Sequence, residues 1–133
     1  MALPDALSRA FEAAKAGDSP LLRTLLLDHG VAFCRAPDSL KHGGSTPAHV
    51  AARNGHADCL RTLHELGAAA SLVAAEARGA TPAHYAAANG HADCLRALHE
   101  LGAVASLVAV DDNGATPAHI AAEEGYTDCL HTL

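Results

Sequence analysis

The sequence predicts an all-α solenoid of stacked helix-turn-helix pairs with hairpin fingers, and three observations lead to it. Thr-Pro-Ala-His begins at Thr46, Thr81 and Thr116, so both intervals (81 − 46 and 116 − 81) are 35 residues. Residues 45–79 and 80–114 differ at nine of 35 positions and agree at the other 26, which marks a duplicated structural unit. Half of the residues are apolar but only 3% are aromatic. Thin layers of Ala, Leu and Val fit that composition better than one thick core.

The repeated tetrapeptide predicts the start of a helix. Thr46 is placed to cap the first turn, and Pro47 occupies the first helical position, where its missing N–H costs nothing. His49 falls at the third position, where its imidazole replaces the usual Glu or Gln of a capping box. The two alanines that follow allow a neighbouring helix to approach closely, and Gly55 ends the helix in the left-handed conformation.

Taken in order, the elements form a single domain over 1–133. Residues 1–44 are expected to be a degenerate N-terminal capping repeat with a first helix over 5–16, a second helix that begins after Asp18–Pro20 and ends near His29, and a finger over 31–44. Complete repeats follow at 45–79 and 80–114, then a truncated one at 115–133. The predicted first helices are 47–54, 82–89 and 117–124, and the second helices lie near 57–66, 92–101 and 127–133.

The end of the sequence lies inside the last of these second helices. We therefore expect Leu130 and Leu133 to be partly exposed. Such an exposed face is typical of a piece cut from a longer repeat array, or of a face that a partner covers.

The run from Gly79 to Arg96 resembles an ankyrin repeat. It reads Gly-Ala-Thr-Pro-Ala-His-Tyr-Ala-Ala-Ala-Asn-Gly-His-Ala-Asp-Cys-Leu-Arg, against the family's Gly-x-Thr-Pro-Leu-His-x-Ala-Ala-x-x-Gly-His. The resemblance covers about residues 8 to 133 and implies an ankyrin-repeat solenoid. The period of 35 residues exceeds the family's ~33, so we expect a longer link between second helix and finger. Other departures are the alanines that replace the family's leucine and the valines where a finger asparagine is common: Ala48, Ala83, Ala118, Val73 and Val108.

Charge and composition exclude several classes of function. The formal net charge is −6 and the isoelectric point is near 5.9, whereas nucleic-acid binding requires a basic surface. No stretch approaches the ~20 apolar residues of a membrane span, and the first five residues lack the basic start of a secretory signal. We therefore expect no nucleic-acid or membrane partner and an intracellular location, cytoplasmic or nuclear.

Cysteine and histidine recur with the repeat. Cys59, Cys94 and Cys129 share one repeat position at the start of the second helices, where we expect small buried hydrophobic side chains. Cys34, in the first finger, is the expected exposed thiol.

The His-x-x-Cys pairs raise the question of a metal site. His56 with Cys59, and His91 with Cys94, supply two of the four ligands that zinc needs. The third copy has Tyr126 in place of the histidine. Packing explains a pair copied in parallel layers better than a metal site or an active site does, so the sequence predicts no metal, no cofactor and no enzymatic activity.

The resemblance implies recognition of another protein or peptide by the concave groove of fingertips and first helices. Carried over to this sequence, the partner-binding positions are Lys41, His42, Ser45, Arg53, Asn54, Glu76, Ala77, Arg78, Ala80, Ala88, Asn89, Asp111, Asp112, Asn113, Ala115, Glu123 and Glu124. Val50, Tyr85 and Ile120 share one position between helices, and Tyr85 is expected to expose an edge.

The groove residues run from basic at the N-terminal end to acidic at the C-terminal end, which predicts a partner of the opposite polarity. Two alternatives stay open: a targeting or autoinhibitory segment of a larger enzyme or channel, and a structural spacer or self-associating array that uses Leu130 and Leu133.

Overall fold

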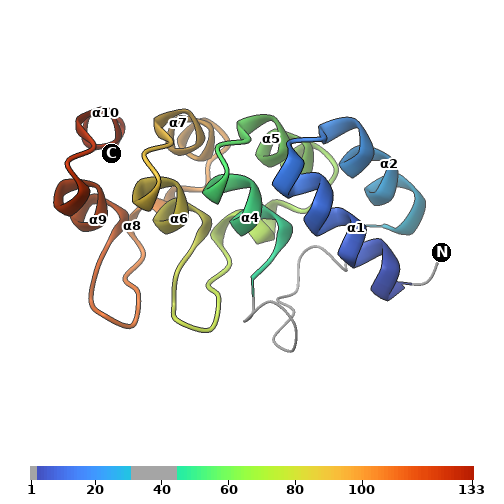
Figure 1. The fold of residues 1–133 in the computed structure, drawn as a ribbon, viewed down its shortest axis with the longest axis horizontal. Coiled ribbons are helices and arrows are strands. Elements are labelled where there is room, and N and C mark those ends of the chain that lie inside the picture. Colours follow the sequence, from blue (N-terminus) through green and yellow to red (C-terminus); the bar gives the residue numbers. More distant parts are fainter. Residues whose placement is uncertain (1–2, 31–44) are drawn as a thin grey trace.

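The computed structural model describes the backbone of residues 3–30 and 45–133, and these residues form a stack of helix-turn-helix pairs (Figure 1). The first helices lie in one row: α1 (Leu3–Ala16), α4 (Pro47–Arg53), α6 (Pro82–Ala88) and α9 (Pro117–Glu124). The second helices lie in the other row: α2 (Ser19–His29), α5 (Ala57–Glu65), α7 (Ala92–Glu100) and α10 (Thr127–Thr132). The connections after α5 and α7 extend below the row of first helices as fingers (Figure 1). The fold is the predicted all-α solenoid.

The repeated tetrapeptide begins the first helices as predicted. A capping box forms at Thr46, Thr81 and Thr116, and each is followed by proline in the first turn. At α4, the backbone N–H of Thr46 donates to Nδ1 of His49 over 3.0 Å. Helices α4 and α6 end one residue earlier than predicted, and Gly55 follows α4 with φ of +81°.

The core is a series of thin layers between repeats. Ala51, Ala52, Ala86 and Ala87 are completely buried, and α4 packs directly against α6. Small side chains permit that approach because no bulky group separates the two backbones. The second helices contribute fully buried leucines to the same core, at Leu60, Leu63, Leu95 and Leu98.

Histidines join each repeat to its neighbour. Nε2 of His49 lies 3.0 Å from the carbonyl oxygen of Ala80, and Nε2 of His84 lies 2.9 Å from that of Ala115. A carbonyl oxygen only accepts, and the threonine N–H at Nδ1 only donates, so Nε2 is the ring nitrogen that donates to the carbonyl in each case. These two bonds hold the backbone that precedes the next Thr-Pro step.

A second set of histidines joins the stack at the turn between paired helices. Nε2 of His56 lies 3.0 Å from the carbonyl oxygen of Lys15, and Nε2 of His91 lies 3.0 Å from that of Arg53. Tyr126 takes the equivalent place before α10, with its ring against Gly90.

The longer link between second helix and finger folds into a short helical segment. It is a 3₁₀-helix after α5 (Ala69–Val73) and an α-helix, α8 (Val104–Val108), after α7. The buried Ser106 hydroxyl accepts a hydrogen bond from the N–H of Ala83 over 3.2 Å. The backbone carbonyl oxygen of Ser106 accepts one from the Thr81 hydroxyl over 3.0 Å. The sequence predicts a longer link here, and the structure shows that the segment after α7 docks against the start of α6, the first helix of the same repeat.

Candidate partner-binding surface

Each of the two described fingers is a tight turn closed by a carboxylate. At Glu76 the backbone N–H donates to the carbonyl oxygen of Ala80 (2.8 Å), and the side-chain Oε1 accepts from the N–H groups of Arg78 (2.6 Å) and Ala80 (3.1 Å). Asp111 repeats the arrangement, since its Oδ1 accepts from the N–H groups of Asn113 and Ala115, both at 2.9 Å. The tips are therefore held by their own side chains.

The two fingers are also joined to each other. The N–H of Asp112 donates to the carbonyl oxygen of Arg78 over 3.0 Å. A partner that lies across both tips therefore meets a surface that is already ordered, which reduces the entropy lost on binding.

The prediction that Glu76 is an exposed contact residue is wrong. The residue is only 8% exposed, and its second oxygen, Oε2, accepts from the Tyr85 hydroxyl over 3.1 Å. Burial raises the pKa of this carboxyl, but the hydrogen bonds from Ala80, Arg78 and Tyr85 outweigh it and leave the pKa below the ordinary value. Glu76 is an ionised anchor for the finger rather than a group free to meet a partner.

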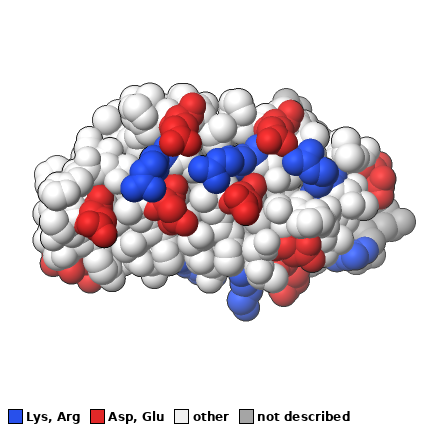
Figure 2. All heavy atoms as spheres, turned by 90° about the horizontal axis from the view of Figure 1, so that it is seen from above, with Lys and Arg blue, Asp and Glu red and all other residues white. Residues whose placement is uncertain are grey.

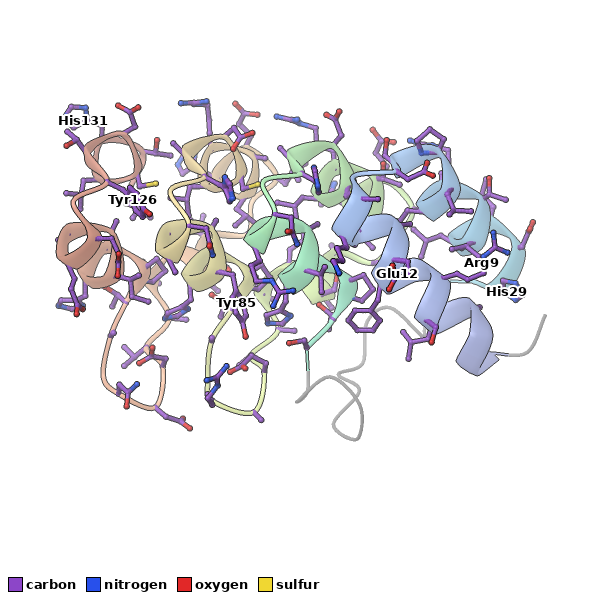
Figure 3. All side chains as sticks on the ribbon, viewed as in Figure 1. Arg9, Glu12, His29, Tyr85, Tyr126 and His131 are labelled. Carbon is purple, nitrogen blue, oxygen red and sulfur yellow. The ribbon has the colours of Figure 1, made fainter. Side chains whose placement is uncertain are left out.

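Tyr85 forms one wall of a hollow between the first helices and the fingers. It projects from α6 on the side where the fingers extend (Figure 3). Its hydroxyl is fixed by Glu76, and its ring meets the His49 ring edge-on at a centroid distance of 5.7 Å and an angle of 86°. The hollow measures about 160 Å³ and is lined by Arg78, Ala80, His84, Tyr85, Ala88, Asp111, Asn113 and Ile120.

The structure gathers five of the predicted contact residues around this hollow: Arg78, Ala80, Ala88, Asp111 and Asn113. The prediction omits His84 and Ile120 from the contact set and names Tyr85 only as a residue with an exposed edge. Tyr85 and Ile120 occupy one repeat position in a first helix, so the periodic alignment could have added them to the surface.

The other predicted contact residues differ in exposure. Arg53, Asn54, Ala77, Asn89, Asp112, Glu123 and Glu124 are exposed, whereas Ser45 and Ala115 are half-buried. The amides of Asn54 and Asn89 turn back onto their own helices, where they donate to the carbonyl oxygens of Val50 (2.9 Å) and Tyr85 (2.8 Å). Lys41 and His42, like Cys34 and the rest of the first finger, lie outside the described residues.

The charges on the second-helix face are arranged differently from those of the groove. Basic and acidic groups alternate along this face (Figure 2). Arg23 pairs with Glu65 at 2.7 Å, and Arg61 reaches Glu100 at 3.7 Å, so the pairs join consecutive repeats. Within the described residues, no ion pair is formed by Arg53, Asp112, Glu123 or Glu124. The groove thus keeps charges that a partner can neutralise.

The cysteines and histidines do not assemble a reactive centre in the described ranges. Cys59, Cys94 and Cys129 are free and fully buried, as predicted, and burial raises the pKa of Cys59 to about 11 and of Cys94 to about 12. In residues 3–30 and 45–133, no three His, Cys, Asp or Glu side chains are placed to hold a metal ion. Over the same ranges, no helix combines the length and apolar character needed to cross a membrane.

A stack of paired helices with projecting fingers defines a helical repeat protein. The sequence matches a family described as "Ankyrin repeats (3 copies)" over residues 10–104 and 66–133, and the chain belongs to the ankyrin repeat family. Ankyrin repeats generally mediate protein–protein interactions and are typically non-enzymatic. No curated protein matched the chain in the sequence comparison.

Proposed function

We propose that this protein is a non-enzymatic recognition module that binds a protein or peptide along the concave surface of its fingers and first helices. The observation that carries the proposal is the hollow bounded by Tyr85, Ile120 and the two fingers, because a hollow that combines apolar side chains with fixed polar groups is typical of a binding site. Its walls are held by internal hydrogen bonds, so little ordering opposes association.

The charges along this surface favour one orientation of the partner. Arg53 and Arg78 lie toward the N-terminal end, whereas Asp112, Glu123 and Glu124 lie toward the C-terminal end. An extended partner then places acidic groups near the arginines and basic groups near the acidic end. The buried Glu76 takes no part in this gradient.

Peptides selected from a random dodecamer phage library against the full chain test the proposal. The variant Arg53→Glu/Arg78→Glu/Asp112→Lys reverses three groove charges, and Arg61→Glu/Arg96→Glu/Asp128→Lys makes the same net change on the second-helix face. We expect the first to weaken binding at least about tenfold and the second to leave it within about twofold. Equal effects of both variants, or failure to select any peptide, contradict the proposed surface.

A further inference from the structure

The two described fingers differ in one respect that bears on the partner's chemistry. In the first, both oxygens of Glu76 have partners, because Tyr85 donates its hydroxyl to Oε2 over 3.1 Å. In the second, Asp111 stands at the position of Glu76, and Ile120 stands at the position of Tyr85, nine residues further on in both cases. An isoleucine cannot donate a hydrogen bond.

Asp111 therefore presents an oxygen with no partner among the described residues. Its Oδ1 accepts from two backbone N–H groups, and no hydrogen bond to Oδ2 is formed in the described chain. These two bonds lower the pKa of Asp111 below its ordinary value, so the group is ionised at neutral pH. Asp111 is one of the residues that line the hollow, together with Ile120 and Tyr85.

The same hollow offers an apolar surface beside that oxygen. Ala80, Ala88 and Ile120 contribute aliphatic side chains to its lining. The hollow measures about 160 Å³ and is open to solvent. One aliphatic or aromatic side chain of a partner fits such a space.

We infer that the partner is a peptide segment that inserts one apolar side chain against Ile120 and places a lysine or arginine beside it, where the cation donates to the open oxygen of Asp111. The inference rests on the proposed function and adds the partner's chemistry. A cation suits this place better than a neutral donor because the exposed Asp112 adds a second negative charge on the same finger, whereas the charge of Arg78 in the lining is paired with Glu76 at 3.6 Å. In the preceding repeat, the Tyr85 hydroxyl donates to the second oxygen of Glu76. At Asp111 the partner's cation supplies the equivalent hydrogen bond.

The test transplants the pair from one repeat to the next. The variant Asp111→Glu/Ile120→Tyr recreates Glu76 and Tyr85 at the second finger, so the chain fills its own hollow. We expect peptides selected as above to carry a basic residue next to an apolar one, and the transplant to weaken their binding at least about tenfold while its melting temperature stays at or above the parent value. Asp111→Asn keeps the shape and removes the charge, and we expect it to weaken the same peptides about tenfold.

The outcomes separate this inference from the proposed function. Some selected peptides could fail to bind the groove charge-reversal variant and still bind both the transplant and Asp111→Asn as tightly as the parent. That result overturns the inference and leaves the proposed function standing. A transplant with a lowered melting temperature leaves Asp111→Asn to decide, since that variant retains the acceptor oxygen for the finger amides. Selected peptides without basic residues also overturn the inference.

Discussion

At the residue scale, Glu76 and Tyr85 fix the shape of the concave surface. A buried carboxylate is stable only when its oxygens are satisfied, and three donors meet Glu76: the N–H groups of Arg78 and Ala80 and the hydroxyl of Tyr85. The same three bonds connect the finger to its own backbone and to the following first helix. The geometry of the candidate surface thus depends on a buried side chain.

Removal of the Glu76 carboxylate should therefore destabilise the fold. We expect Glu76→Ala to lower the free energy of unfolding by about 2 to 3 kcal/mol, because three donors lose a charged acceptor. Asp112→Ala, at an exposed position of the next finger, is the control and should change it by less than about 0.5 kcal/mol. Urea unfolding followed by circular dichroism measures both, and equal losses would contradict the role given to Glu76.

His49 gives the stack a dependence on pH. Burial lowers the pKa of His49 below its ordinary value of 6.5, although the hydrogen bond to Ala80 acts in the opposite direction. The folded state thus binds fewer protons than the unfolded state. The contribution of His49 to the free energy of unfolding is fully present above the pKa of the histidine in the unfolded chain, near 6.5, and declines as the pH falls below that value.

The corresponding experiment measures urea midpoints between pH 7.5 and pH 5, a range that stays above the titration of Glu76. We expect the parent chain to lose stability on acidification and His49→Gln, already less stable at pH 7.5, to lose less over the same interval. A variant whose midpoint falls as steeply as that of the parent would show that other groups cause the pH dependence.

At the element scale, the periodic part of the fold was predictable and the links were not. The Thr-Pro-Ala-His motif and the glycine that follows set both ends of a first helix by local hydrogen bonds, so α4 and α6 match the prediction to within one residue. The helical turn at Val104–Val108 depends instead on Ser106 docking against Thr81 and Ala83 of the same repeat. Such contacts do not follow from local propensity.

The candidate site divides in the same way. The candidate contact positions came from the ankyrin resemblance, and some of them, such as Arg53 and Arg78, also differ between the two complete repeats. The resemblance placed Glu76 among the contact residues because an acidic residue in a turn is usually solvated, but here the side chain is buried and accepts a hydrogen bond from Tyr85, nine residues away. The periodic pattern alone contained no sign of that bond.

Two glycines with positive φ offer a matched pair for mutation: Gly55, between α4 and α5, and Gly102, after α7. Gly55 has φ of +81°, and an added Cβ would lie 2.8 Å from Nδ1 of His91, whereas Gly102 has φ of +80° with nothing within 4 Å. Gly102→Ala should cost about 1 to 2 kcal/mol, the strain of a left-handed alanine.

Gly55→Ala should cost at least about 1 kcal/mol more than Gly102→Ala, because the His91 ring must move away from its bond to Arg53. Thermal and urea unfolding of the two variants provide the comparison. Equal costs would show that the His91 bond contributes nothing to the junction between repeats.

At the scale of the whole molecule, stability is distributed along the stack. Helix α7 packs against α5, α6, α8 and α10, whereas α10 packs against α7 and α9. Repeat proteins behave approximately as a sum of units and nearest-neighbour interfaces. The pair α9 and α10 should therefore open at a lower free energy than the pair α6 and α7 in this chain, and Leu130 and Leu133, each 39% exposed, agree with its thinner packing.

The buried cysteines report this opening, since each second helix carries one of them at the same position. Cys94 and Cys129 are fully buried, and burial raises the pKa of both thiols, so neither reacts with a thiol reagent while its layer is closed. In a Cys34→Ser background at pH 8, we expect Cys129 to be labelled by an aromatic disulfide reagent at least about tenfold faster than Cys94, because its layer has fewer interfaces to break. Peptide mass spectrometry of timed samples gives the two rates. Identical rates would mean that the stack opens as one cooperative unit, contrary to the repeat-by-repeat behaviour inferred from the helix contacts.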